Sequence, residues 1–374
     1  CFLTIQILVS LIPLAFYPNH LHLPMTKIYL LIFWLGVSIL ATAQNNRYYV
    51  NQQAAGANTG LSWPDAFTDL QQALQIAQAG DEVWVAQGTY RPTDGANRNT
   101  AFEPKSGVQL YGGFAGSETG VDARDWAAHP TVLSGDIGVA GDSTDNSYNV
   151  MYLHQPDSNT IVDGLILRHG VADAFSGGAF DRVKCGGGLY IMGKDWEAYP
   201  VIRNCVFEQN TAKNYGGGAM VNGLGNGSIA PQFINCRFEN NRALNSGGGL
   251  ARLGASWVER EKDLCACVFI KNSAVFLGGA LYSTDAERTD HLDIEKCQFL
   301  YNSGGNLGGG AYIEIGRELG ADISFDSVMF SNNSSREGAA LYLTVYGFQY
   351  TNNIYIKKCN FFKNYTTWPS NSRS

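Results

Sequence analysis

The sequence repeats itself with a period of about 31 residues, and this repeat restricts the fold more than any other feature. Its signature is a phenylalanine followed three positions later by an asparagine, and successive phenylalanines lie 31, 31, 30, 31 and 31 residues apart. Self-similarity at such a period is typical of solenoids, in which each repeat packs on the next. The six copies are Phe207 with Asn210, Phe238 with Asn241, Phe269 with Asn272, Phe299 with Asn302, Phe330 with Asn333, and Phe361 with Asn364.

Other positions keep a constant distance from this pair. Two residues before each phenylalanine lies a cysteine, except at Val328, and five residues before it lies a large apolar residue such as Ile202. Residues two apart share one face of a strand, so the cysteine and phenylalanine are both predicted to point inward. The apolar residue has the opposite parity, which predicts a bend or bulge before the cysteine. The cysteines are Cys205, Cys236, Cys267, Cys297 and Cys359.

The polar and small positions of the repeat also have a physical reason. The asparagine suits a left-handed turn, and its amide can hydrogen-bond to the asparagine of the next coil. Six residues after it comes a block of small residues, such as 216–219 and 247–250. Glycines there are expected where the chain turns or passes close to neighbouring backbone.

These columns predict an all-β fold, a right-handed parallel β-helix with coils of about 31 residues. A row of hairpins or propeller blades would need a reverse-turn signal in every repeat, and Asn226-Gly227 does not recur. A helix is predicted over 64–79, with Ser62 and Asp65 at its start and Gly80 after its end. Its apolar stripe would cap the first coil.

The beginning of the sequence is interpreted apart from the repeat. Residues 1–24 start with Cys and are expected to be upstream translation or a fragment, the alternative being a second membrane segment. Residues 25–43 have the pattern of a signal peptide, with Lys27, an apolar run over 28–40 and a small-residue cleavage site ending at Ala43. A run of 13 apolar residues is short for a membrane anchor.

The remaining boundaries follow from the repeat. An N-terminal cap and first coil are predicted over 44–100, and the β-helix over 101–374. We expect the sequence to be truncated, because the sixth repeat stops before its small-residue block.

Charge and cysteine usage exclude some functions. The net charge is −7, and removing 1–43 with its single lysine makes it −8, so nucleic acid is not an expected partner. Export implies an oxidising compartment. Equivalent Cα atoms in stacked strands lie about 4.8 Å apart, at the short end of the range for a disulfide. The cysteine column therefore predicts free, buried thiols.

Two resemblances follow from these motifs. The segments 49–51, 62–63, 70–74 and 80–90, with Tyr-Gly-Gly-Phe at 111–114, resemble the start of secreted pectin-lyase-like β-helix proteins of Bacteroidota. The Phe-x-x-Asn and Gly-Gly-Ala units resemble the repeats of chlamydial polymorphic outer-membrane proteins, and together the resemblances cover about 47–364. They imply a β-helix fold. The chlamydial relatives further imply a surface adhesin attached to the outer membrane through a C-terminal region beyond this sequence.

Pectin-lyase-like folds often carry polysaccharide lyases or hydrolases, so the resemblance also implies candidate catalytic residues. The hydrolase motifs Asp-Asp, Gly-His-Gly and Arg-Ile-Lys do not occur. General acid and base catalysis needs two such groups held across a sugar bond. The alternative is a set of solvated loop charges near a bend. The best remaining candidates are Asp163, Arg168, His169, Asp173, Asp181 and Lys184.

A second polar cluster suggests a cation. Asp136, Asp142, Asp145 and Asn146 lie close together in a glycine-rich stretch. Closely spaced oxygen ligands suit Ca²⁺, although the spacing matches no EF-hand loop. The alternative is a polar turn. Ca²⁺ is the one cofactor that the sequence suggests.

Variable segments of the repeat offer a binding surface. They lie at 193–200, 222–230, 254–263, 283–291, 316–320 and 345–353, and stacking would place them in one row. Aromatic residues there would contact a glycan or protein, the alternative being that each packs against its own loop. These aromatic residues are Trp196, Trp257, Tyr346 and Tyr350.

The sequence thus predicts a non-catalytic β-helix, secreted or on the outer-membrane cell surface. It would act as an adhesin or binding module for an extracellular polysaccharide or a host or cell-surface protein. The alternative is a polysaccharide lyase or glycoside hydrolase acting on uronic-acid polysaccharides.

Overall fold

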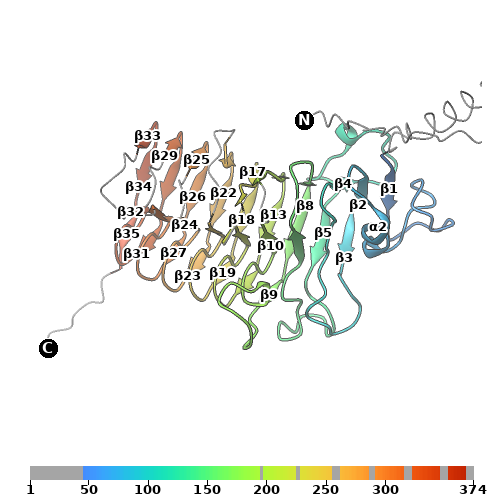
Figure 1. Cartoon of the computed structure of the whole chain (residues 1–374), viewed down its shortest axis with the longest axis horizontal. Coiled ribbons are helices and arrows are strands. Elements are labelled where there is room, and N and C mark those ends of the chain that lie inside the picture. The colour runs from blue at the N-terminus through green and yellow to red at the C-terminus, as the bar shows by residue number, and fades with distance from the viewer. Residues whose placement is uncertain are drawn as a thin grey trace, which may run out of the picture. The chain divides into compact units, whose positions relative to one another are not determined.

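The computed structural model describes residues 45–193, 197–224, 228–254, 262–285, 291–315, 322–345 and 353–367. From Asn45 onward the chain forms one compact unit, a stack of coils (Figure 1). Strands that pair with each other come from different coils and run parallel, which confirms the predicted parallel β-helix. Among the described residues, no helix is long and apolar enough to cross a membrane.

Four long sheets, here called A to D, run along the stack. Sheet A contains β1 (Arg47–Val50), β2 (Glu82–Ala86), β4 (Gln109–Phe114), β7 (Ile161–Asp163), β12 (Val201–Arg203), β17 (Gln232–Ile234), β21 (Leu264–Cys265), β25 (His291–Glu295), β29 (Asp322–Asp326) and β33 (Asn353–Lys357). Sheet B contains β3 (Gly88–Tyr90), β5 (Thr131–Ser134), β8 (Leu165–Arg168), β13 (Val206–Glu208), β18 (Arg237–Glu239), β22 (Val268–Ile270), β26 (Gln298–Leu300), β30 (Met329–Ser331) and β34 (Asn360–Phe362).

The other two sheets start later in the chain. Sheet C contains β6 (Met151–His154), β10 (Leu189–Met192), β15 (Ala219–Asn222), β20 (Leu250–Leu253), β24 (Leu281–Asp285), β28 (Ala311–Ile315) and β32 (Leu341–Val345). Sheet D contains β9 (Val171–Ala172), β14 (Thr211–Ala212), β19 (Arg242–Ala243), β23 (Ser273–Ala274), β27 (Ser303–Gly304), β31 (Ser334–Ser335) and β35 (Tyr365–Thr366). A short pair joins β11 (Glu197–Ala198) to β16 (Ser228–Ile229), and 3-10 turns lie at η1 (Val121–Ala123) and η2 (Arg182–Lys184).

The corner between sheets A and B confirms the predicted bend. In the coil that contains β12 and β13, Asn204 has a φ of +53° and separates the two strands. After this left-handed residue, Cys205 and Phe207 both point into the core and are fully buried. The described cysteines are all free, as predicted, although Cys359 is only half-buried.

The corner between sheets B and D corrects one prediction. The repeat asparagine itself was expected to be left-handed, but the residue before it takes that conformation, as Gln209 does with a φ of +55° before Asn210. The reason is that the asparagine side chain must point inward. The Nδ2 of Asn210 donates to the Oδ1 of Asn241 at 3.1 Å and to the carbonyl oxygen of Leu167 at 3.0 Å. The predicted bonding between asparagines of successive coils is therefore confirmed.

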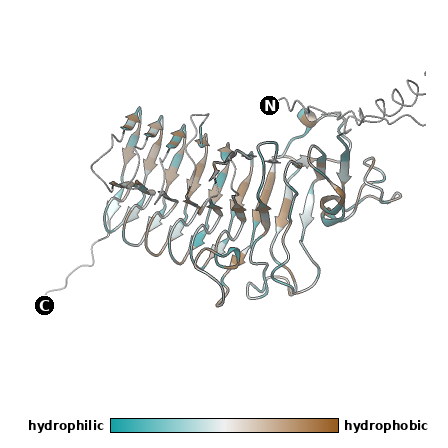
Figure 2. Cartoon of the chain, viewed as in Figure 1, coloured by the Kyte–Doolittle hydropathy of each residue, from teal (hydrophilic) through white to brown (hydrophobic). Residues whose placement is uncertain are grey.

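The repeat phenylalanines form a continuous stack inside the solenoid. Ring centroids of Phe207 and Phe238 lie 4.7 Å apart, and those of Phe238 and Phe269 lie 4.6 Å apart with planes within 4°. In Figure 2 the hydrophobic colour is carried largely by the strands, which line this core. Such contacts bury apolar surface and add aromatic stacking energy.

The small-residue block lies where neighbouring coils approach closely. Gly216 has a φ of +67°, and a Cβ added to Gly217 would lie 2.4 Å from the carbonyl oxygen of Arg242. A side chain at Gly217 would therefore collide with backbone, which explains why this position is small in the repeat.

The N-terminal helix is shorter than predicted. α2 spans Leu70–Ile76, with Asp69 as its N-cap, instead of 64–79. Ser62 and Asp65 bond to each other in a turn, and Phe67 forms a bridge with Val50, so the chain ahead of the helix is extended. Leu70 is buried in the main core. That the helix serves as a cap stays a prediction.

Candidate functional site

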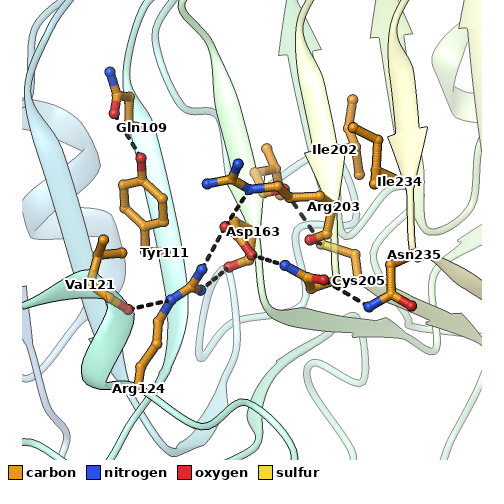
Figure 3. Close-up of polar contacts among 12 residues, drawn as sticks. Gln109, Tyr111, Val121, Arg124, Asp163, Ile202, Arg203, Cys205, Ile234 and Asn235 are labelled. Atoms are coloured by element: carbon orange, nitrogen blue, oxygen red, sulfur yellow. Dashed lines mark hydrogen bonds and ion pairs between the residues drawn. The ribbon is translucent and has the colours of Figure 1, made fainter. Parts of the chain in front are cut away.

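Asp163 is the most buried of the predicted catalytic residues, and two arginines surround it. It ends β7 and is fully buried at the corner that leads to β8. Its Oδ2 accepts hydrogen bonds from the Nη2 of Arg124 at 2.5 Å and the Nε of Arg203 at 2.6 Å, and its Oδ1 accepts one from the Nδ2 of Asn204 at 2.8 Å (Figure 3). These partners occupy both carboxylate oxygens. The arrangement suits a structural ion pair better than an acid or base.

Arg124 comes from a segment that the sequence left unassigned. It follows η1 and reaches across sheet A, where its guanidinium also donates to the carbonyl oxygens of Val121 and Gly112. Its side chain is 5% exposed, whereas that of Arg203 is 40% exposed. A buried carboxylate and guanidinium that bond to each other avoid most of the cost of desolvation.

The other predicted catalytic residues do not converge. Arg168 lies 3.7 Å from Glu208, and the imidazole Nε2 of His169 lies 2.9 Å from the Oε1 of Gln209. Asp181 accepts a bond from the backbone N–H of Gly178, and the Nζ of Lys184 donates to the carbonyl oxygen of Gly177. Asp173 pairs with Arg98 at 2.7 Å. Within the described ranges, no side-chain hydrogen bond or ion pair joins any two of the predicted catalytic residues.

The three candidate Ca²⁺ aspartates accept hydrogen bonds from their own turns, whereas Asn146 bonds to another coil. Asp136 accepts from the N–H of Gly141 at 2.8 Å, Asp142 from the N–H of Thr144 at 2.9 Å, and Asp145 from the N–H of Val139 at 2.7 Å. The side chain of Asn146 donates to the carbonyl oxygen of His169. In the part of the chain that the structure describes, no three His, Cys, Asp or Glu residues are grouped as metal ligands. The structure thus does not bring these aspartates together as a cation site.

The four predicted contact aromatics lie outside the described residues, namely Trp196, Trp257, Tyr346 and Tyr350. The strands before their segments are described, however. β10, β15, β20, β24, β28 and β32 pair with their neighbours in register, so these segments leave adjacent strand ends.

One cluster at the edge of this row was not predicted from the sequence. Arg252 in β20 is 1% exposed, and its Nη2 lies 3.5 Å from the Oδ1 of Asp263. Asp263 is also buried, and burial raises its pKa although Arg252 opposes that shift. Its Oδ2 accepts the backbone N–H of Asp293 at 2.9 Å. The available signal was an arginine at a position where the coil before it has Val221 and the second coil after it has Ile313.

A small polar cavity lies among the first coils, between residues 52 and 94. Its volume is about 310 Å³, and it lies beside the start of α2 and the end of β3. Asp69, Arg91 and Asp94 contribute charged groups to its wall. The guanidinium of Arg91 donates to the carbonyl oxygen of Asp136, which fixes one side of the cavity.

Comparisons with known proteins carry no argument about this chain. No family model matches the chain, and no curated protein matches it. A solved structure of the pectin methylesterase from Aspergillus niger in deglycosylated form is similar, with 11% identity, a TM-score of 0.33, and coverage of 89% of this chain and 93% of that one. Because both the identity and the TM-score are low, the likeness carries no argument about function. What is established is that this chain is a parallel β-helix, on the evidence of its own sheet pairing.

Proposed function

We propose that this chain is a secreted or surface-exposed β-helix that binds an extracellular polysaccharide or a cell-surface protein without catalysing a reaction. The observation that carries the proposal is the register of sheet C. Its strands end side by side, as at Asn222 beside Leu253 and at Asp285 beside Ile315. Neighbouring parallel strands lie about 4.8 Å apart, so the variable segments start as one row along the stack. A row of variable segments on a rigid scaffold is a common basis for binding.

The contacts of the charged residues support binding over catalysis. Asp163 is occupied by Arg124 and Arg203, and Lys184 by a backbone carbonyl. Catalysis on a glycan needs an acid and a base that both face one substrate. The residues predicted for those roles are instead distributed over separate structural contacts.

The direct test uses aromatic residues of the variable segments. The double variant Trp257→Ala/Tyr350→Ala is compared with Leu61→Ala/Phe175→Ala, whose side chains are 69% and 95% exposed outside the row. Binding is measured on immobilised acidic and neutral polysaccharides and on intact cells. We expect the first variant to bind at least about tenfold more weakly, which is about 1.4 kcal/mol, and the second to bind like the parent. Equal binding by both variants would refute the role of the row.

The enzymatic alternative is tested on the same protein. It is incubated with uronic-acid polysaccharides with and without Ca²⁺, and unsaturated products and reducing ends are followed over time. We expect neither to accumulate. Turnover that disappears on changing Arg168→Ala or His169→Ala would overturn the non-catalytic proposal.

A further inference from the structure

Arg252 occupies a position whose equivalents in other coils lie in the hydrophobic core. It is the third residue of β20, where it pairs in register with Val221 on one side and Ser283 on the other. At the same position in other coils, Ile191, Val221 and Ile313 are fully buried in the main hydrophobic core. The arginine side chain therefore enters the interior of the solenoid, where it is one of the largest fully buried side chains.

The guanidinium of Arg252 lacks the hydrogen bonds that a buried arginine needs. Its Nε, Nη1 and Nη2 have no hydrogen-bond partner in the described part of the chain, and the approach of Asp263 at 3.5 Å is too long for a strong one. Burying a charged donor without partners is costly. The other well-buried arginine, Arg124, bonds to Val121, Gly112 and Asp163. The contrast shows that this fold can satisfy a buried guanidinium, whereas the described residues around Arg252 do not.

Neighbouring polar atoms share this lack of partners. The Nε2 of His291 and the Oδ1 of Asp293 are also buried and have no hydrogen-bond partner within the described ranges, although that Nε2 lies 3.9 Å from the Oδ2 of Asp293. The other oxygen of Asp293 accepts a bond from the Nζ of Lys262 at 3.0 Å, and Lys262 is partly exposed. The cluster therefore extends from the core at Arg252 to the surface at Lys262.

We propose that Arg252 anchors a binding site for an oxyanion, namely a carboxylate or sulfate group of a small ligand. The planar guanidinium offers parallel N–H donors whose geometry matches two oxygens of such a group. Ser283, its neighbour in the next coil, has a shorter side chain than the isoleucine that follows at Ile313. The imidazole of His291 and the ammonium of Lys262 supply further donors at the edge of the site. This site is independent of the proposed row of contact aromatics and goes beyond it.

Asp263 sets how strongly the site attracts an anion. Burial raises the pKa of its carboxyl group, while Arg252, the N–H of Asp293 and His291 lower it and the charge of Asp293 raises it further. As the pH falls, protonation of Asp263 removes the negative charge beside Arg252. Anion binding is therefore expected to strengthen as the pH falls.

The test measures binding of acetate and of sulfate to the full chain by isothermal titration calorimetry and by thermal unfolding. Ionic strength is kept constant with sodium chloride, because sulfate also stabilises proteins non-specifically. The key variant is Arg252→Val, which restores the residue type of the neighbouring coil, and the matched control is Arg237→Met, whose side chain is 42% exposed. Arg252→Lys keeps the charge but lacks the planar pair of donors.

We expect the parent and Arg237→Met to bind one anion per chain with a saturable rise in the unfolding midpoint that grows as the pH falls. Arg252→Val should fold and lose this response, and Arg252→Lys should bind at least tenfold more weakly. Acetate and sulfate are separate arms, and whichever binds more tightly identifies the group. An identical response of parent and Arg252→Val, or no saturable response to either anion, would show that Arg252 is only a hydrated structural charge. Polysaccharide binding plays no part in this assay, so its outcome does not depend on the proposed function.

Discussion

The asparagine ladder, defined as the stacked Asn210, Asn241, Asn272, Asn302, Asn333 and Asn364, allows a quantitative prediction. In Asn272→Ala, the N–H and Nδ2 of Asn241 lose their acceptor, which lies at 3.1 and 3.0 Å, and the carbonyl oxygen of Phe238 loses its donor at 2.9 Å. Asn302 keeps a donor in the backbone N–H of residue 272 at 2.9 Å. The change therefore strands the N–H of Asn241, one of its two Nδ2 hydrogens and the carbonyl oxygen of Phe238, while Nδ2 keeps its bond to the carbonyl oxygen of Phe207 at 2.8 Å.

Each stranded group costs about 1–3 kcal/mol, so the free energy of unfolding should fall by about 3–9 kcal/mol. We expect the lower half of that range, because a water molecule that enters the space would satisfy part of the loss. Asn364→Ala is the matched control. It removes the same three bonds from Asn333 and Phe330, but Asn364 is only half-buried, so solvent can replace them. Its cost should stay below about 1.5 kcal/mol.

The assay is urea unfolding at 25 °C, followed by far-ultraviolet circular dichroism and by tryptophan fluorescence, since a long repeat can unfold in more than one step. Asn272→Asp adds an internal check. It keeps the acceptor for Asn241 but places a carboxylate oxygen against Phe238 and Asn302 as acceptors. Its pKa should be raised in the folded state, so the variant should recover stability as the pH falls from 7 to 4. Equal midpoints for Asn272→Ala and Asn364→Ala would refute the reasoning.

Three further predictions concern the core, the buried ion pair and the thiols. Phe269→Asp places a charge between the rings of Phe238 and Phe299, whose centroids lie 4.6 and 4.8 Å from that of Phe269. It should give unfolded or aggregated protein by circular dichroism and gel filtration. A folded variant would contradict the inward orientation of the repeat phenylalanines. Asp163→Asn leaves two guanidinium groups without their counter-charge and should lower the free energy of unfolding by about 3–5 kcal/mol in chemical denaturation. Arg203→Met should lower it by about 1 kcal/mol or less, because the Arg203 side chain is 40% exposed. Burial raises the pKa of Cys205 to about 12, so in native protein at pH 8 this thiol should resist iodoacetamide, while the half-buried Cys265 is modified first. Equal labelling of the two cysteines in peptide mass spectrometry would argue against this burial.

The regular part of the fold could be predicted from the sequence because equivalent positions of the repeat meet the same physical requirement in every coil. The phenylalanine at 269 and its equivalents must be apolar to stack, and Gly217 and its equivalents must be small to pass a neighbouring carbonyl. The backbone conformation was harder to assign. The left-handed residue before each asparagine is Gln209, Lys271 or Tyr301 in different coils, so no residue type marks it. Likewise α2 was placed too early, because the Ser62–Asp65 turn imitates a helix start.

The candidate site was less predictable because its contacts cross coils that do not repeat regularly. Arg203 lies opposite Asp163 in the register of sheet A, and an alignment of the coil at 161–168 with the later repeats would have revealed it. Arg124 has no such signal, since it follows an irregular segment and reaches Asp163 from outside the repeat. Arg252 shows the reverse case, in which a departure from a regular column is itself informative.

The direction of the asparagine ladder bears on how such a molecule changes in evolution. From Asn210 to Asn364, the Nδ2 of each asparagine donates a hydrogen bond to the Oδ1 of the asparagine in the next coil. All these bonds therefore point in one direction along the stack. Every coil therefore presents an acceptor to the coil before it and donors to the coil after it, and this pair of complementary sides is the same from coil to coil. Whole coils can be gained, lost or exchanged without redesign of their neighbours, whereas a partial coil would interrupt every column at once. Natural variation in length should consequently occur in whole coils, and changes of one or a few residues should be confined to the segments between sheets C and A.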